Sequence, residues 1–271
     1  MKIGSWGRYQ SIEAEVLLPQ TQSECARMIE NSAALIPRGA GRSYGDSALN
    51  TTVIQSTYRK HYIEFDEVAG TLTCEAGVSL QEILQLIIPK GWFLAVTTGT
   101  SFVTLGGAIA SDVHGKNHHT YGTFSQCVQS FKLMLGTGEV VHVSHEHLPE
   151  LFRATCGGMG LTGLILSATI QLIPIQSSQI RQTTTRASCL EEVCAQFEAN
   201  NLSTYSVAWI DCLASGKQLG RSLLMMGEHA QDGVLELTKP RAMNIPLEMP
   251  RGVLNHYSIK LFNALYFYKA H

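Results

Sequence analysis

The sequence predicts an α+β protein of roughly two domains. Residues 21–24 and 79–82 both have the Ser/Thr-x-x-Glu pattern of a capping box, in which two side chains satisfy backbone N–H groups at a helix start. Apolar runs flank the compact turn at 136–138, which is typical of a β-hairpin. The chain has 271 residues, 45% of them hydrophobic, and a domain size of about 150 residues gives roughly two domains.

The first part of the chain alternates helices and strands. We expect, in chain order, a helix at 21–34, strands at 35–37, 62–65 and 72–75, and a helix from 79 to about 89. The segment 104–110 is rich in small residues, and we interpret it as a loop whose backbone N–H groups are bare and therefore suited to phosphate.

A hairpin and an apolar strand complete the first domain. The expected elements are strands at 128–135 and 139–143, a short helix at 148–156, and a strand at 164–173 that stops at Pro174. We place the boundary there, which gives domains 1–174 and 175–271. In the second domain we expect a helix near 189–199, strands near 206–210 and 222–226, a loop containing Pro240, Pro246 and Pro250, and an aromatic run at 261–268. That run must dock, because it would otherwise expose a large apolar patch.

Composition and charge argue against several classes of protein. Lys+Arg 20 against Asp+Glu 22 gives a net charge of -2, too little to attract nucleic acid. The first residues lack the pattern of a signal peptide and no run reaches the roughly 18 apolar residues of a membrane span, so we expect a cytoplasmic protein. Seven scattered cysteines without a Cys-x-x-Cys pair predict reduced core thiols and no metal site.

The segment 39–45, Gly-Ala-Gly-Arg-Ser-Tyr-Gly, is a candidate phosphate loop. It follows a predicted strand, and its small residues let the backbone approach a pyrophosphate and donate N–H bonds as an anion nest. Arg42 and Ser43 add side-chain donors. The alternative is a tight turn that merely needs glycine for positive φ, and phosphate binding is favoured over it.

The string Gly158-Met159-Gly160-Leu161-Thr162-Gly163 matches Gly-x-Gly-x-x-Gly but is not a Rossmann motif. That motif follows a strand, opens a helix and has an acidic residue about 20 positions later. Here a helix is predicted before the string and a strand after it, and 183–185 are threonines. A backbone contact with a nucleotide remains open.

The densest polar cluster is 114–119, His-Gly-Lys-Asn-His-His. We rank three interpretations: an active-site loop first, a solvated loop second and a metal site third. His114 and Lys116 could bind an anionic substrate and handle a hydroxyl proton. A metal site would need His114 and His118 on one helix face, and Gly115 and Asn117 weaken a helix there.

Three segments together, 37–46, 106–119 and 157–163, resemble the decaprenylphosphoryl-ribose oxidase-like branch of the vanillyl-alcohol oxidase/p-cresol methylhydroxylase superfamily. The likeness continues weakly through 208–211, 219–221 and 265–269, and so covers nearly the whole chain. It implies a two-subdomain FAD-binding domain of the p-cresol methylhydroxylase type over 1–174 and part of an α+β substrate domain over 175–271. Because the family's substrate domain is longer, we expect a truncated form.

The resemblance implies FAD bound without a covalent bond, because Arg42 occupies the position at which some members attach the flavin through a histidine. It implies His114 and Lys116 as catalytic residues on the substrate side of the flavin. The implied cofactor-binding residues are Arg38, Gly39, Ala40, Gly41, Arg42, Ser43, Tyr44, Gly99, Thr100, Thr104, Gly106, Gly107, Ser111, His114, Gly160, Gly163 and Ile165.

The implied reaction is oxidation of a secondary alcohol of a polyprenyl-phosphate sugar to a ketone, as in the epimerisation of a cell-wall sugar precursor. Hydride passes to the flavin while a base takes the hydroxyl proton. Alternatives are an aldonolactone or alditol oxidase, and a flavin-binding fragment that is inactive without a missing C-terminal half. Expected partners are a small-molecule or lipid-linked sugar, a reductase and a separate polypeptide supplying that half, with a peripheral location at a membrane face and no nucleic acid.

Overall fold

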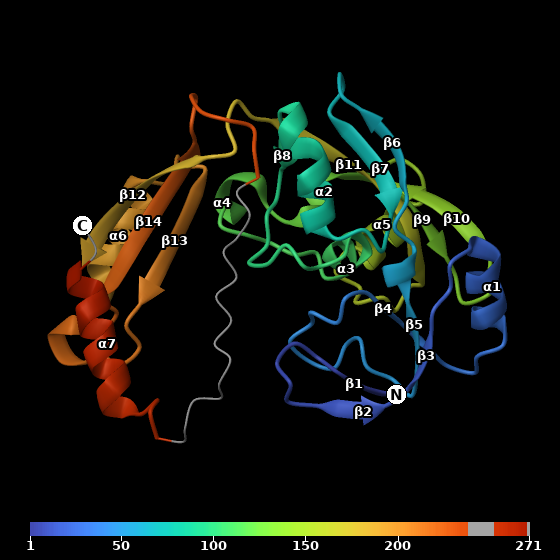
Figure 1. Cartoon of the computed structure of the whole chain (residues 1–271), viewed down its shortest axis with the longest axis horizontal. Helices are drawn as coiled ribbons and strands as arrows, with labels where there is room; N and C mark the ends of the chain where they lie inside the picture. Colours follow the sequence, from blue (N-terminus) through green and yellow to red (C-terminus); the bar gives the residue numbers. More distant parts are fainter. Residues whose placement is uncertain (238–251, 270–271) are drawn as a thin grey trace. The chain divides into compact units, whose positions relative to one another are not determined.

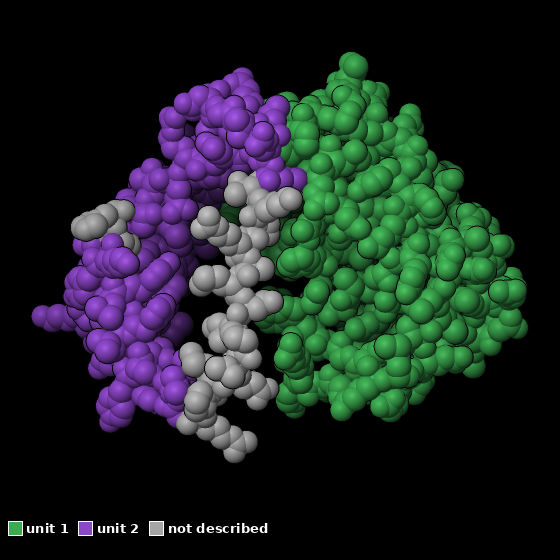
Figure 2. Space-filling model, viewed as in Figure 1, with its two compact units in different colours: residues 1–175 green, residues 176–271 purple. Residues whose placement is uncertain are grey.

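The computed structural model describes residues 1–237 and 252–269 and divides the chain into two compact units, Met1–Ile175 and Gln176–His271 (Figure 2). The division falls one residue after the boundary expected from Pro174. Both units mix helices and strands, so the predicted α+β class is confirmed.

Unit 1 starts with two small sheets. Their strands are β1 (Lys2–Gly4), β2 (Ser11–Glu13), β3 (Glu15–Leu17), β4 (Ile36–Arg38) and β5 (Thr52–Gln55). The first two pair antiparallel, and the others form a parallel sheet in the order β3-β5-β4. Helix α1 (Gln22–Glu30) connects β3 to β4, and its predicted capping box is present, with the Thr21 hydroxyl accepting from the Glu24 N–H.

A six-stranded antiparallel sheet forms the larger part of unit 1 (Figure 1). Its strands are β6 (Tyr62–Asp66), β7 (Thr71–Glu75), β8 (Trp92–Leu94), β9 (Val128–Met134), β10 (Val140–Ser144) and β11 (Leu164–Pro174). The order is β10-β9-β11-β7-β6, and β8 also pairs with β11. The predicted hairpin is confirmed as β9 and β10, and β11 lies at the centre of the sheet.

Helical segments cover this sheet. They are η1 (Ser56–Tyr58), α2 (Leu80–Ile87), η2 (Ile88–Lys90), α3 (Leu105–Ala110), α4 (His118–Tyr121), η3 (Phe124–Cys127) and α5 (Pro149–Thr155). The predicted capping box of Ser79 and Glu82 opens α2. The main core lies between sheet and helices and includes the fully buried Ile83, Ile109 and Phe131.

A second apolar cluster joins the parallel sheet of unit 1 to its six-stranded sheet. Cys25 and Ile29 of α1 and Ile54 of β5 pack there against side chains of β9 and β11. The loop after β4 is thereby held against the segments that follow β7 and β8, and the candidate site lies at this junction.

Unit 2 contains a three-stranded antiparallel sheet in the order β12-β14-β13 and two longer helices. The elements are β12 (Ile180–Ala187), α6 (Leu190–Ala199), β13 (Tyr205–Ile210), η4 (Gly216–Gln218), β14 (Ser222–His229) and α7 (His256–Lys269). Sequence patterns predicted α6, β13 and β14 but not β12. The predicted proline-containing loop at 240–250 lies outside the described residues.

The aromatic run docks only in part. Phe267 and Asn263 of α7 are buried, whereas Leu261, Phe262 and Leu265 are 62%, 61% and 62% exposed. In the described stretches 1–237 and 252–269, no helix has both the length and the apolar character that crossing a bilayer requires.

Candidate functional site

A pocket of about 590 Å³, including its open mouth, lies entirely within unit 1. Five chain segments form its four walls. In order, the four walls contain Pro37, Arg38, Gly39, Ser43, Ser47 and Ala48; Ser56 and Ala76; Gly106, Gly107, Ala110 and Ser111; and Thr155, Met159, Gly160, Gly163, Leu164 and Ile165.

The loop 39–45 offers unpaired backbone donors along one wall. Among the residues that the structure describes, none accepts a hydrogen bond from the backbone N–H groups of this loop. The loop is fixed from outside, because the Trp6 N–H donates to the Ser43 carbonyl over 2.9 Å. Gly41 has φ of 66°, a left-handed conformation that places successive N–H groups toward a common side. These are the features of an anion-binding nest.

Arg38 places a buried positive charge behind this loop. Its Nη1 donates to the Ala48 carbonyl over 2.9 Å and its Nη2 to the Gly4 carbonyl over 2.8 Å. Within 1–237 and 252–269, no carboxylate forms an ion pair with Arg38. Burial lowers the pKa of the guanidinium from its ordinary value, but an arginine remains protonated in proteins. The charge is thus left without a counter-charge at a pocket wall, which favours an anionic ligand.

Gly39 is required for a close approach between the loop and α3. A Cβ at this position would lie 2.2 Å from Oγ1 of Thr104. Thr104 is the N-cap of α3, and its Oγ1 accepts the Gly107 N–H over 3.2 Å. The first wall and the third wall of the pocket therefore meet at one hydroxyl.

The expectation of bare N–H groups at 104–110 is wrong, because this run is the helix α3. Its first N–H groups already have acceptors: Leu105 donates to Val78 O over 2.8 Å and Gly106 to Ala76 O over 2.9 Å. Gly106 lets the helix approach β7, since a Cβ there would lie 2.8 Å from the Ala76 Cβ. Gly106 therefore serves packing, and the unpaired backbone donors at the pocket are those of the loop 39–45.

The fourth wall contains the rejected Rossmann-like string. Helix α5 precedes it and β11 follows it, which confirms that it is not a dinucleotide-binding turn of the Rossmann type. Its backbone is unusual: φ is 52° at Met159, 83° at Gly160 and 148° at Gly163. A Cβ at Gly163 would also lie 2.4 Å from the Met134 carbonyl oxygen. Both Gly160 and Gly163 line the pocket.

The structure separates the cofactor-binding residues expected from the resemblance into two groups. Those that line the pocket are Arg38, Gly39, Ser43, Gly106, Gly107, Ser111, Gly160, Gly163 and Ile165. Those that do not line it are Ala40, Gly41, Arg42, Tyr44, Gly99, Thr100, Thr104 and His114. Tyr44 is 79% exposed and contacts Trp6, and the Arg42 guanidinium lies 5.9 Å from the centre of the Phe102 ring.

Sequence reasoning missed the second wall of the pocket. Ser56 belongs to η1 and Ala76 follows β7, and neither lies in the glycine-rich or histidine-rich segments that the sequence singled out. A buried serine in a short 3₁₀ helix gives no local signal, so only the packing of η1 against the end of β7 identifies these residues.

The segment 111–117 has a fixed backbone and exposed basic side chains. Asp112 accepts the Ser125 N–H over 2.8 Å, and the buried Asn117 donates to the Ala95 carbonyl over 2.6 Å. A Cβ at Gly115 would lie 1.5 Å from the Thr97 carbonyl oxygen. His114 and Lys116 are exposed, a few residues after Ser111 of the pocket wall.

The metal interpretation of this segment finds no support in the structure. Helix α4 begins at His118, so His114 and His118 do not share a helix, and their rings make an edge contact with centres 5.5 Å apart. In the described part of the chain, no group of three or more His, Cys, Asp or Glu side chains could hold a metal ion.

Comparison with known proteins identifies the domain around this pocket. Residues 14–144 match the model of a family described as FAD binding domain. This range, just under half of the chain, is thus similar to that family. It includes the candidate phosphate loop, the η1 segment, α3 and the His114 segment, while β11 and the fourth wall follow it.

Curated relatives of the FAD-binding domain include oxidases. A decaprenylphosphoryl-beta-D-ribose oxidase of Mycolicibacterium smegmatis is 33% identical over 99% of this chain and 63% of its own length. An uncharacterised protein of Streptomyces coelicolor is 40% identical over 65% of this chain and 50% of its own. A D-arabinono-1,4-lactone oxidase of Kluyveromyces lactis is 28% identical over 56% of this chain and 30% of its own. The chain therefore spans less than two thirds of each relative and is related to FAD-linked oxidoreductases.

Proposed function

We propose that unit 1 binds FAD without a covalent bond and that the pyrophosphate lies against the loop 39–45. The observation that carries this proposal is the set of unpaired backbone N–H groups in that loop, beside the buried and uncompensated guanidinium of Arg38. A diphosphate supplies the negative charge and the acceptor oxygens that such donors bind. Gly39 and Gly163 have no side chain, so the loop can approach Thr104 and the fourth wall can approach Met134 as closely as they do here.

The pocket walls support non-covalent binding. Among the residues that line the pocket there is no His, Cys or Tyr, so no nucleophilic side chain of these types lies there to attach a flavin. The resemblance implies that some members attach the flavin through a histidine at the position of Arg42, and the Arg42 guanidinium lies over the Phe102 ring here.

We propose that the reaction is oxidation of a secondary alcohol of a polyprenyl-phosphate sugar. Bound flavin supplies an acceptor for the hydride. Lys116 would bind the phosphate of the substrate and His114 would take the hydroxyl proton. Hydrogen bonds of Asp112 and Asn117 fix the backbone on either side of these two residues. The match to the mycobacterial oxidase over 99% of this chain favours this substrate over the aldonolactone of the yeast relative, whose match covers 56%.

Flavin titration followed by anaerobic reduction tests these steps in order. We expect FAD to bind and to be recovered free after denaturation, since no covalent bond forms. With the additional polypeptide proposed below also present, the bound flavin should then bleach with a polyprenyl-phospho-ribose and not with D-arabinono-1,4-lactone. Bleaching by the lactone alone would favour the aldonolactone alternative, and absence of FAD binding would refute every flavin-based function.

We also propose that catalysis requires a further polypeptide that completes the substrate domain. Exposed Leu261, Phe262 and Leu265 on α7 support this, because a helix that is apolar on most of its surface normally packs against other protein. Repeating the bleaching with and without a polypeptide equivalent to the unmatched part of the mycobacterial relative tests it. Equal rates of bleaching in both samples would contradict the requirement.

Two further partners belong to the same proposal. A separate reductase would act on the ketone product to complete an epimerisation, and a lipid-linked substrate would bring the protein to a membrane face. Both depend on a polyprenyl-phosphate sugar as substrate, so a flavin that does not bleach with that sugar would contradict both.

A further inference from the structure

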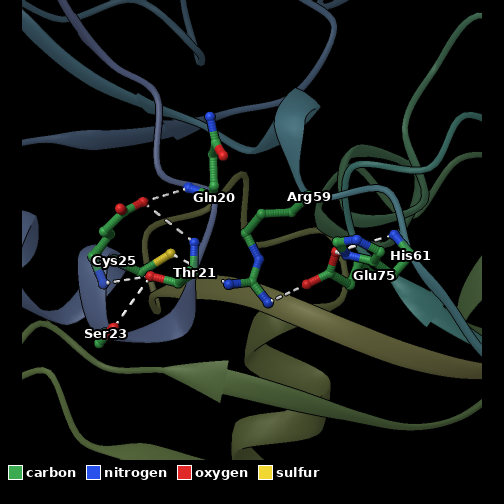
Figure 3. Close-up of polar contacts among 8 residues, drawn as sticks. Gln20, Thr21, Ser23, Cys25, Arg59, His61 and Glu75 are labelled. Carbon is green, nitrogen blue, oxygen red and sulfur yellow. Dashed lines mark hydrogen bonds and ion pairs between the residues drawn. The ribbon is translucent and has the colours of Figure 1, made fainter.

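A buried ion pair lies beside the candidate cofactor pocket. Arg59 follows η1 and Glu75 ends β7; their side chains are 8% and 10% exposed, and Nη2 of Arg59 lies 2.5 Å from Oε1 of Glu75. Figure 3 shows the Arg59 side chain extended between Cys25 on one side and Glu75 on the other.

The pair is joined directly to two residues of the pocket wall. The Arg59 N–H donates to the carbonyl of Ser56 over 2.9 Å, and Glu75 immediately precedes Ala76. The Gly77 N–H donates to the Arg59 carbonyl over 3.1 Å. A Cβ at Gly77 would lie 2.0 Å from the Ser56 carbonyl oxygen, so the two backbones are as close as glycine allows.

The Arg59–Glu75 pair also contacts α1 and the residue before β6. Nη1 of Arg59 donates to Sγ of Cys25 in α1 over 3.7 Å. Burial raises the pKa of this thiol, so it stays neutral and the Glu75 carboxylate is the charge that balances Arg59. The second oxygen of Glu75 accepts the His61 N–H over 3.0 Å and lies 2.8 Å from Nδ1 of His61.

Backbone hydrogen bonds also connect Ala76, the residue after Glu75, to α3. The Ala76 carbonyl accepts a hydrogen bond from the N–H of Gly106, one of the α3 residues in the third wall, over 2.9 Å. The Ala76 N–H donates to the Leu166 carbonyl of β11 over 2.9 Å. The end of β7 therefore sets the positions of the second and third walls together.

A buried ion pair contributes little net stability compared with an apolar pair of similar volume, because both charges lose their hydration. A buried arginine pair instead provides defined geometry, because the planar guanidinium holds its hydrogen-bond partners in fixed directions. From the position of the pair between η1 and β7, we propose that Arg59 and Glu75 are positioning residues that fix the pocket walls for the cofactor. This inference rests on the proposed FAD site and adds to it the residues that preorganise it.

The decisive variant is the double substitution Arg59→Met with Glu75→Leu. It removes both charges together and keeps the volume, so the protein is expected to fold with an unchanged melting temperature. Arg59→Lys is the second variant, since it keeps the charge but cannot reach Cys25 and Glu75 together. Lys60→Met is the matched control, because Lys60 is the next residue and its ion pair with Glu82 is on the surface, with side chains 47% and 35% exposed.

Two measurements on each variant separate positioning from general stability. The first is amide hydrogen exchange in the protein without cofactor, at the N–H groups of Ala76, Gly77 and Gly106. The second is the dissociation constant of FAD, measured well below the melting temperature. We expect the double variant to exchange these amides about tenfold faster and to bind FAD about tenfold more weakly, with exchange in β9 and β10 unchanged. Arg59→Lys should lie between the wild type and the double variant, and Lys60→Met should match the wild type.

The two measurements also distinguish this inference from the proposed function. If the wild type does not bind FAD, the FAD site is refuted, and faster exchange in the double variant would still support the positioning of the walls. If the wild type binds FAD and the double variant shows the same exchange and the same affinity, the positioning role is overturned and the FAD site stands.

Discussion

At the scale of single residues, Gly39 lies too close to Thr104 to accommodate a side chain. Alanine at 39 would bring its Cβ to 2.2 Å from the Thr104 Oγ1, so either the loop or the start of α3 must move. We therefore expect Gly39→Ala to weaken FAD binding by about tenfold or more, which is about 1.4 kcal/mol. Fluorescence titration with FAD measures this effect.

Gly45→Ala is the control for this prediction. Gly45 belongs to the same loop, but no atom lies within 4 Å of a Cβ built there. Its FAD affinity should stay within about twofold of the wild type, which is about 0.4 kcal/mol. If both variants bind alike, the approach of Gly39 to Thr104 does not matter for the site.

The sequence located the glycine-containing parts of the pocket because glycine clusters are local signals. Gly39, Gly106 and Gly163 were identified in this way, but the reason for their presence is contact with distant backbone or side chains, which no local pattern reveals. Arg42 and Tyr44 were expected in the site as neighbours of those glycines. Their side chains instead pack outward on Phe102 and Trp6, and adjacency in sequence could not distinguish the two directions.

At the scale of elements, the cap of α3 connects local structure to the pocket. This helix has six residues, and Thr104 supplies its N-terminal acceptor while being 2% exposed. Thr104→Ala should destabilise unit 1 by about 1 kcal/mol, the usual effect of losing a helix cap. Thr104→Ser retains the hydroxyl and should keep most of that stability. Urea denaturation of both variants makes the comparison, and equal losses would show that the hydroxyl is not the important group.

Helix α7 is held to unit 2 by a buried polar cluster. Asp211 accepts hydrogen bonds from Asn263 of α7 over 2.6 Å and from Arg221 over 2.8 and 2.6 Å, and the Arg221 guanidinium lies over the Phe267 ring. Burial alone would raise the pKa of Asp211, but the hydrogen bonds from Arg221, Leu213 and Asn263 outweigh it and the pKa lies below its ordinary value. Asp211 thus stabilises the fold while it is ionised.

The sign of the pH effect follows from the lowered pKa. The contribution of Asp211 is fully present above the ordinary aspartate pKa of about 3.9 and is lost as the pH falls below it. Asp211→Asn should remove the pH dependence of stability that Asp211 causes. It should also lower the free energy of unfolding by about 3–5 kcal/mol at neutral pH, because it leaves Arg221 buried without a counter-charge. Thermal unfolding from pH 3 to 7 measures both effects.

Asp232→Asn is the matched control in the same unit. Asp232 pairs with Arg181 at 3.4 Å, but the two side chains are 83% and 75% exposed. Its removal should cost less than about 1 kcal/mol, as is usual for surface ion pairs. A similar loss in both variants would mean that burial of the Asp211 cluster is unimportant.

Elements with strong local chemistry were predictable, and those formed by distant pairing were not. The capping boxes of α1 and α2 and the β9–β10 hairpin depend on residues close in sequence. Strand β12 carries Arg181, Gln182 and a run of threonines, so it lacks an apolar pattern, and it forms by pairing with β14 more than 30 residues later. Helix α3 was mistaken for a loop because its two glycines are unfavourable for a helix. The acceptors for its first N–H groups are Val78, Ala76 and Thr104, two of which are distant in sequence.

At the scale of the whole molecule, every residue that lines the pocket belongs to unit 1. A ligand that binds only the folded state stabilises that state by mass action, by about 2.7 kcal/mol when its concentration is 100 times the dissociation constant. Calorimetry should therefore show that FAD raises the unfolding transition of unit 1. Asp211→Asn identifies the transition of unit 2, so the two can be assigned.

Gly39→Ala serves as the control for this calorimetric prediction. It should reduce the upward shift that FAD causes by about half, because tenfold weaker binding lowers the stabilisation by about 1.4 kcal/mol at the same FAD concentration. Asp211→Asn should leave that shift intact. A shift that is unreduced in Gly39→Ala and disappears in Asp211→Asn would place the ligand in unit 2 and contradict the assignment of the pocket.

The single hydroxyl shared by two walls also constrains how this sequence can diverge. Any side chain larger than hydrogen at 39 needs the space that the Thr104 Oγ1 occupies, and any change at 104 alters what 39 can accept. The two positions should therefore covary among descendants of the same ancestor, with a residue other than glycine at 39 found only beside a smaller residue at 104. A smaller residue at 104 would have to arise first, and only then would a residue other than glycine be tolerated at 39.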